Sequence, residues 1–288
     1  MQAKSPLLIQ PTRLTSTGVI VSVTPQQAGW SLLDVKVLRL KPGDTHHLST
    51  TNSELGCIIQ HGRIKVSVNG GSPETLGRRT SVFEDKPYAL YLSTNMDARL
   101  SALDDVELAI CSVPAATSNP YAIVRPEDCA VELRGGDNAS RQIVSVFPPG
   151  FQCEKLVCVE VYTPSGNWSS YPPHKHDRHT VRPDGTIAEA DLEETYFYRF
   201  DRPDGFAYQR VYTSDKRLDE LVRATDYSIV LVPEGYHPVV SGVGSTTYYL
   251  NFLAGSAQSL ANTDDPEYTW IKSTLGPLDP RLPIVPRR

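Results

Sequence analysis

The chain has 288 residues, of which 40% are hydrophobic and 21% charged, and 28 Lys and Arg against 33 Asp and Glu give a formal net charge of −5. This composition is typical of a globular protein and excludes a disordered or fibrous chain. The acidic balance argues against nucleic acid as a partner, because nonspecific binding needs clustered basic side chains. The length predicts one large or two medium domains that fold without disulfides.

Neither the cysteines nor the N-terminal residues indicate an exported or membrane protein. The five cysteines are an odd number without a CxxC pair, which argues against a zinc knuckle or a thioredoxin-type motif. Cys158 lies in an apolar run and is expected to be a small buried hydrophobic residue. Residues 1–6 lack the apolar segment of a signal peptide, and no window approaches 18 uninterrupted apolar residues. We therefore expect a cytoplasmic protein with reduced thiols and no membrane partner.

Short strands are predicted along most of the chain. Residues 31–40 and 63–68 place apolar side chains at every second position, and Asn69-Gly70 after the second segment supplies a tight turn. Most candidate strands are short and are separated by Gly, Pro or Asp, which is typical of a β-sandwich or barrel. The other predicted strands are residues 89–92, 106–113, 156–162, 195–200, 206–212, 228–232 and 247–253.

One segment alone, residues 215–224, predicts a helix, because its apolar residues have helical spacing. The 23 prolines fit a mostly-β protein, since helices tolerate proline poorly and turns use it. Five of them lie between residues 266 and 286 and predict an irregular C-terminal arm, which Tyr268 and Trp270 could anchor to the body.

A softer boundary near residues 119–128 separates two strand-rich halves of similar size. No residue-level repeat connects the halves, yet each is long enough for one small barrel. We therefore predict an N-terminal barrel over residues 1–128 and a C-terminal barrel over residues 129–288, which includes the proline-rich arm.

Candidate metal ligands are concentrated in the second half. On a strand, His174 and His176 would project from the same face and offer two imidazoles to a divalent metal ion. A third ligand could be Glu193 or Glu194, just before an aromatic strand, and a fourth could be His237 in the turn sequence PEGYH. Solvated loop histidines are the usual alternative for an isolated HxH pair. The ordered pattern HxH…E…H favours the metal site.

This order, with PxG before the last histidine, resembles the cupin superfamily of small β-barrels. It departs from the usual pattern, because seventeen residues separate His176 from Glu194 and Tyr227 stands where a glycine is expected. A long insertion at this place, together with the string NWSSYPPHKHD (167–177), resembles the 5-deoxy-glucuronate isomerases of inositol catabolism. Other segments that resemble this family are LGRRTSVFEDKPYALYLST (76–94), LEETYFYRF (192–200), FAYQRVYT (206–213), LVPEGYHPV (231–239) and YYLNFLAG (248–255).

The resemblance implies an all-β bicupin fold, with two jelly-roll barrels, few short helices and a single metal site in the second barrel. It also implies that Glu194 rather than Glu193 is the ligand. The first barrel is expected to be metal-free and structural, because His46 and His47 are adjacent and would point to opposite faces of a strand. The implied cofactor is one divalent ion, expected to be zinc, with manganese, iron or nickel as alternatives, held by His174, His176, Glu194 and His237.

The implied reaction is the aldose–ketose isomerisation of 5-deoxy-D-glucuronate to 5-dehydro-2-deoxy-D-gluconate, so the expected partner is a small sugar acid. Strand parity places Tyr196 and Tyr198 on the same face as Glu194, where their phenols could donate to substrate oxygens. Either Arg210 or Gln209 would face the cavity, and Arg210 is the candidate clamp for the sugar carboxylate.

Two other functions remain open at this point. The same ligands could hold Fe(II) in a cupin dioxygenase, or the barrel could bind a sugar acid without catalysis. The sequence has no DNA-reading helix, so a non-catalytic sugar-binding barrel would not be a transcriptional regulator. A homo-oligomer is possible.

Overall fold

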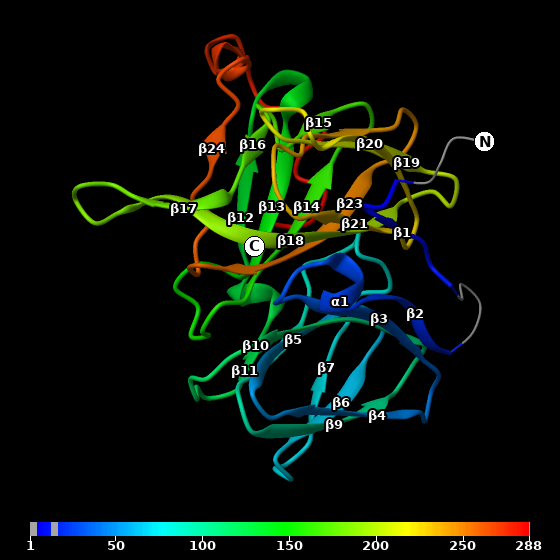
Figure 1. Ribbon diagram of the computed structural model, residues 1–288. Coiled ribbons are helices and arrows are strands. Elements are labelled where there is room, and N and C mark those ends of the chain that lie inside the picture. The colour runs from blue at the N-terminus through cyan, green and yellow to red at the C-terminus, as the bar shows by residue number, and fades with distance from the viewer. Residues whose placement is uncertain (1–4, 13–16, 288) are drawn as a thin grey trace.

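The computed structural model describes residues 5–12 and 17–287, and β-strands dominate these residues (Figure 1). The short helices are α1 (Pro25–Ala28), η1 (Pro126–Asp128), η2 (Asp137–Ala139) and η3 (Thr269–Ser273). The prediction of an all-β protein with few short helices is therefore confirmed. In the described ranges no helix combines the length and the apolar character that crossing a bilayer requires.

Two sheets form the first barrel. The larger sheet has the order β11 (Ala122–Val124), β8 (Ala89–Leu92), β5 (Ser53–His61), β10 (Val106–Pro114), β3 (Asp34–Leu40) and β2 (Gly18–Val23). The smaller sheet has the order β4 (Thr45–Thr50), β9 (Met96–Ala102), β6 (Ile64–Val68) and β7 (Glu74–Leu76). Apolar side chains fill the space between them, among them Leu48, Cys57, Ile64, Leu100 and Leu108.

The second barrel is formed by the strands after η1 together with strand β1 (Leu8–Ile9). Its larger sheet has the order β1, β21 (Ile229–Val232), β18 (Ile187–Phe200), β23 (Thr247–Gly255), β14 (Val157–Thr163), β13 (Arg141–Phe147) and β12 (Ala130–Arg134). Its smaller sheets are β15 (Trp168–Ser169), β22 (Val239–Ser241), β19 (Phe206–Tyr212) and β20 (Asp219–Thr225), and the pair β16 (His174–Lys175) with β24 (Thr263–Asp264). Strand β1 belongs to this sheet although it lies near the N-terminus.

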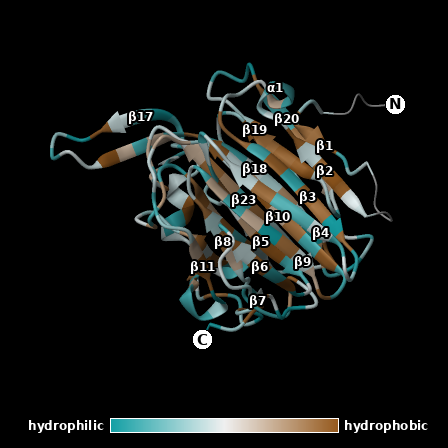
Figure 2. Ribbon diagram, turned by 90° about the horizontal axis from the view of Figure 1, so that it is seen from below, coloured by the Kyte–Doolittle hydropathy of each residue, from teal (hydrophilic) through white to brown (hydrophobic). Residues whose placement is uncertain are grey.

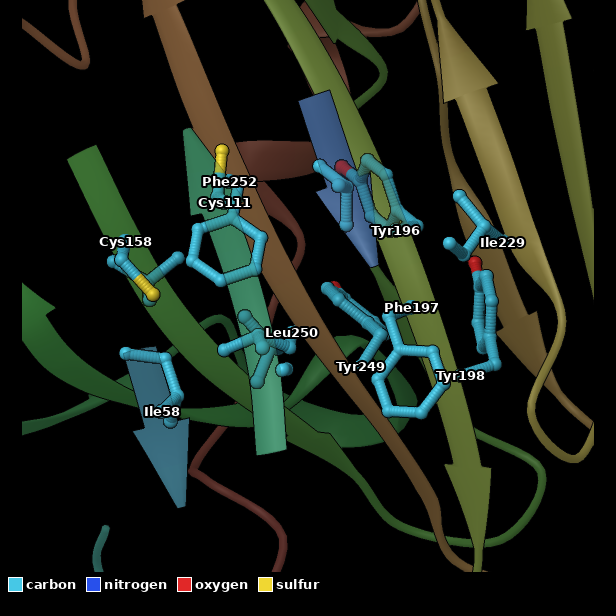
Figure 3. Packing of buried hydrophobic residues seen from close by; sticks show 14 of the residues in the cluster. Ile58, Cys111, Cys158, Tyr196, Phe197, Tyr198, Ile229, Tyr249, Leu250 and Phe252 are labelled. Carbon is cyan, nitrogen blue, oxygen red and sulfur yellow. The ribbon is translucent and has the colours of Figure 1, made fainter. Parts of the chain in front are cut away.

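The two larger sheets pack against each other through a shared apolar cluster. Val35 and Cys111 of the first barrel join Cys158, Phe197 and Phe252 of the second in this cluster, which Figure 3 shows in part. Because each of these strands also fills its own barrel with alternate side chains, both of its faces are buried and the strand reads as a continuous apolar run. Figure 2 shows many hydrophobic residues along these strands. The prediction that Cys158 is a buried hydrophobic residue is confirmed.

A buried ion pair also joins the barrels. Arg79 donates to both carboxylate oxygens of Glu160 on β14, with the shorter contact at 2.7 Å, and both side chains are almost fully shielded from solvent. Tyr162 and Tyr248 each donate a hydroxyl hydrogen bond of 2.9 Å to the same carboxylate. Glu160 thus has its charge and its lone pairs satisfied inside the molecule.

We expect Glu160→Gln to lower the free energy of unfolding by about 3–5 kcal/mol, because it leaves the buried Arg79 guanidinium without a counter-charge. Unfolding by chemical denaturant measures this change, provided that the variant and the wild type have the same m-value. The control is Asp104→Asn, which removes the exposed partner of Arg63 and should alter stability little. Equal stability of the Glu160→Gln variant and the wild type would show that the pair does not hold the barrels together.

The predicted helix at residues 215–224 is wrong. The segment forms a turn and then β20, which pairs with β19 from Asp219 opposite Tyr212 to Thr225 opposite Phe206. Val222 faces the core, whereas Leu221 is 66% exposed. The segment is therefore a strand, because pairing with β19 and burial of every second side chain stabilise it more than a helix with the same apolar residues would be stabilised.

The C-terminal arm is mostly irregular, as predicted, and crosses the outside of the second barrel. Tyr268 contacts the ring of Tyr171, with centroids 6.2 Å apart, but Trp270 is 61% exposed and does not anchor the arm. The arm is fixed further along, where Val285 is buried and exchanges backbone hydrogen bonds with the Gln142 side chain.

Candidate metal centre

A cavity inside the second barrel is lined by four of the eight predicted site residues, His174, His176, Glu194 and Tyr196. Strands β12, β13, β14, β18 and β23 supply its walls. Valine, leucine and isoleucine side chains form the apolar part of the lining. The polar part includes Arg141, His174, His176, Glu194, Tyr196 and Asn251.

Three of the four predicted ligands converge in this barrel. His176, Glu194 and His237 each offer one ligand atom, and these atoms lie within 4.8 Å of one another. The Oε2 atom of Glu194 is 3.0 Å from Nε2 of His176 and 3.4 Å from Nε2 of His237. All three residues are buried, with exposed fractions of 6% or less. Among the described residues, no other group of three or more histidine, cysteine or acidic side chains has its ligand atoms this close together.

The alternation of β18 separates the two neighbouring glutamates. Glu194 points into the second barrel. Glu193 points the other way and accepts hydrogen bonds of 2.7–3.0 Å from the backbone amides of Ser31, Leu32 and Leu33 in the first barrel. One glutamate therefore belongs to the cavity and the other to the contact between the barrels.

A tight turn brings His237 to His176 and Glu194. Gly235 has φ +84°, and a Cβ there would lie 2.4 Å from the carbonyl oxygen of Tyr212, so the turn requires glycine. The carbonyl oxygen of Gly235 accepts a hydrogen bond of 2.9 Å from Nδ1 of His237, which fixes the tautomer. The Nε2 lone pair then faces Glu194, and this buried atom has no hydrogen-bond partner in the described part of the chain. A metal ion would satisfy it, so the residues fit a divalent cation.

His174 lies beside this group. Its ring centroid is 5.0 Å from that of His237, and it lines the same cavity, but it is half-buried and does not belong to the three-residue group. Lys175, between the two histidines, points away and pairs with Asp177 and with Glu189, the latter at 2.8 Å. The alternate directions of His174-Lys175-His176 are those expected of an extended segment.

The environment sets the protonation of these histidines. Burial, reinforced by neighbouring imidazoles, lowers the pKa of His174 and of His237 to about 3. Burial also acts to lower the pKa of His176, but its hydrogen bond to Glu194 and the charge of that carboxylate outweigh burial and raise it. Two of the imidazoles are thus held neutral, which is the form that binds a metal ion.

The predicted substrate residues lie in different places. Tyr196 lines the cavity, and its hydroxyl is 3.4 Å from that of Ser170. Tyr198 follows on the same strand face (Figure 3), but its hydroxyl donates to Oε1 of Gln209 at 2.8 Å, and neither residue is part of the cavity lining. This hydrogen bond engages the Tyr198 hydroxyl and Oε1 of Gln209 inside the barrel, away from the lining of the cavity.

Gln209 faces inward, so Arg210 faces outward. The Arg210 guanidinium donates two hydrogen bonds of 2.7 Å to Asp219 on the neighbouring strand and lies over the ring of Tyr212. The expectation that Arg210 clamps the substrate carboxylate does not survive this placement. Parity alone could not choose between the two residues, because nothing in the sequence shows which face of β19 is the inner one.

The sequence interpretation missed the arginines of this cavity. Arg141 opens β13 and lies opposite Arg134, the last residue of β12, and both guanidiniums border the cavity. The sequence of β13 does indicate that Arg141 lies on the same strand face as Ile143 and Ser145, because the three are two residues apart. It could be interpreted only once the inner face of the strand was known.

A second hollow, of about 630 Å³, lies between the barrels and is no comparable candidate. Its charged side chains are bound to one another: Glu107 accepts from Arg39 at 2.5 Å and from Arg199 at 2.9 Å. Arg199 also pairs with Asp226 at 2.9 Å. These charged side chains therefore serve as contacts between the barrels and are not free for a ligand.

Known proteins resemble this chain over most of its length. Residues 7–271 match the KduI/IolB family. The chain belongs to this family. It is 38% identical over 255 residues to the 5-deoxy-glucuronate isomerase of Geobacillus thermodenitrificans, an alignment that covers 88% of this chain and 91% of the relative. It is 36% identical over 260 residues to the enzyme of that name from Bacillus subtilis strain 168, with coverage of 89% and 94%.

Solved structures share the whole architecture of this KduI/IolB family member. The crystal structure of an IolB-like protein from Salmonella typhimurium LT2 superposes with a TM-score of 0.86 at 36% identity and covers 92% of this chain and 98% of that one. Bacillus subtilis oxalate decarboxylase superposes with a TM-score of 0.60 at 13% identity, with coverage of 96% and 85%, and shows the fold alone. The chain therefore has the predicted bicupin fold.

Proposed function

We propose that this protein is a metal-dependent aldose–ketose isomerase that converts 5-deoxy-D-glucuronate to 5-dehydro-2-deoxy-D-gluconate in inositol catabolism. The family relatives named for this activity support the substrate and the reaction. The observation that carries the proposal is the convergence of the buried side chains of His176, Glu194 and His237. The five free cysteines fit a reducing compartment, and we place the enzyme in the cytoplasm.

The second barrel, residues 129–288 together with strand β1, would bind one divalent ion per chain, and the first barrel, formed by the rest of residues 1–128, would be structural. His176, Glu194 and His237 would hold the ion, with His174 completing the set of three imidazoles and one carboxylate. This donor set suits zinc, and also manganese, iron or nickel. A bound ion of this kind acts as a Lewis acid that polarises a carbonyl oxygen and acidifies the neighbouring C–H bond.

The chain's own side chains would prepare the site for this chemistry. Burial raises the pKa of Tyr196 well above its usual value, so its hydroxyl stays protonated and can donate to a substrate oxygen as negative charge develops there. Val159 and Val161 of β14 and Leu253 of β23 line the same cavity, and apolar surroundings strengthen such a hydrogen bond.

The test is conversion of 5-deoxy-D-glucuronate under strict exclusion of oxygen, followed by NMR of the sugar carbons. We expect the ketose product to form at the same rate with and without oxygen, because an isomerisation needs no oxidant. Oxygen uptake coupled to substrate loss would instead show a cupin dioxygenase with Fe(II). Saturable binding of the sugar acid without turnover would show a non-catalytic binding protein, and either result would overturn the proposal.

A further inference from the structure

The register of the β12–β13 hairpin places Arg141 at the cavity of the second barrel that His176 and Glu194 line. Arg134 and Arg141 are the last pair of this hairpin before its loop. The inner face of β13 carries Arg141, Ile143 and Ser145, which all border the cavity. The neighbouring Gln142 points to the opposite face, where it is bound by the C-terminal arm.

The Arg141 guanidinium has no ion-pair or hydrogen-bond partner in the described part of the chain, although the residue is half-buried. Glu132, an acid on the same hairpin, is bound to Arg134 at 2.6 Å. Burial lowers the pKa of Arg141, and the like charge of Arg134 acts in the same direction. Shielding a cation from water without a counter-charge is costly, so an arginine that remains in this state is suited to an anion that is not part of the protein.

Arg141 also lies between the metal group and the outside. A neighbouring hollow of about 430 Å³ shares Arg134, Arg141 and His174 with the cavity and is bordered by the exposed Lys272 and Gly276. His237, in contrast, is 1% exposed. A ligand that enters from this hollow therefore meets the two guanidiniums before it reaches the buried histidines.

We propose that Arg141 binds the carboxylate of the sugar acid and so makes the enzyme selective for uronic acids over neutral aldoses, an inference that rests on the proposed isomerase function. The carboxylate would stay at the outer end of the cavity on the planar guanidinium, which binds such a group through two parallel hydrogen bonds. The aldehyde end would then extend inward to His176, Glu194 and His237. Arg210, the clamp expected from the sequence, is occupied by Asp219 and takes no part.

The first experiment combines a side-chain change with a substrate change. Arg141→Gln should raise KM for 5-deoxy-D-glucuronate by about 10- to 100-fold and leave kcat within a few-fold, because the carboxylate is remote from the reacting carbons. With the neutral analogue that carries CH2OH in place of the carboxylate, wild type and variant should have the same KM. Arg141→Lys should restore part of the loss, and Arg210→Leu, the matched control, should change neither KM.

The second experiment does not depend on turnover. Calorimetric titration with D-glucuronate measures carboxylate binding by the metal-loaded wild type, Arg141→Gln and Arg210→Leu. Loss of affinity in Arg141→Gln alone supports the inference even if the protein proves not to isomerise the proposed substrate. Unchanged affinity, or an equal rise in KM for the acid and its neutral analogue, would overturn it, because Arg141 would then act only on the structure of the barrel.

Discussion

Glu194→Gln is expected to reduce kcat/KM for 5-deoxy-D-glucuronate by about three orders of magnitude, because loss of a ligand forfeits several kcal/mol of transition-state stabilisation. The amide keeps the shape of the side chain but removes the charge that two imidazoles face at 3.0 and 3.4 Å. Steady-state kinetics and elemental analysis of the same preparation measure the activity and the bound metal.

The adjacent Glu193 offers a matched control. Glu193→Gln makes the same chemical change one residue away, but this side chain binds the backbone amides of residues 31–33 outside the cavity. It should lower stability while metal content and kcat/KM stay close to those of wild type. The assignment of the ligand would be contradicted if Glu193→Gln, rather than Glu194→Gln, lost metal and activity.

Acidification is expected to destabilise the metal-free protein. The pKa of His237 falls from 6.5 to about 3 on folding, because burial disfavours the imidazolium. Between these values the unfolded chain binds a proton that the folded chain does not, so stability falls as the pH falls. The loss from pH 7 to pH 5 is about 2 kcal/mol for His237. His174 acts with the same sign, whereas His176, whose pKa is raised, stabilises the folded form below pH 6.5 and offsets part of the loss.

Bound metal makes this dependence steeper. The ion binds neutral imidazoles in the folded state, so zinc should raise the melting temperature markedly at pH 7.5 and much less at pH 5. Thermal unfolding with and without zinc at both pH values measures the difference. His237→Ala should abolish the zinc effect, and His47→Ala, which removes an exposed imidazole from the first barrel, should leave it intact. A zinc effect that survives in His237→Ala would place the metal elsewhere.

The strands most visible in the sequence are those with one buried and one exposed face, or with clear turn residues at both ends. Strand β19 has the predicted bounds, and β6 buries Ile64 and Val66 as its alternation indicates. Strand β5 was not predicted, since its residues from Glu54 to Gln60 are all buried and show no periodicity. Strand β4 was missed because Leu48 is its only apolar residue, so its alternating burial leaves no hydrophobic pattern in the sequence.

The site was predictable to the extent that it is local. The HxH pair and His237 stand out because strand parity and a glycine turn put their directions into short stretches of sequence, whereas the choice of Glu194 over Glu193 came from the family resemblance. Arg141 does not stand out, since its position depends on the pairing of β12 with β13 and on the packing of that hairpin against β14. The choice of Gln209 over Arg210 as the inward residue likewise depends on which face of β19 the rest of the barrel covers.

Stoichiometric reconstitution of the metal-free protein tests the central claim most directly, because it measures the metal and the isomerisation together. Protein stripped with a chelator is titrated with zinc at pH 7.5, and the rate of ketose formation from 5-deoxy-D-glucuronate is recorded at each addition. We predict no turnover without metal and a linear rise that ends at one equivalent per chain. Full activity in the metal-free protein would contradict the proposal that His176, Glu194 and His237 hold a catalytic ion.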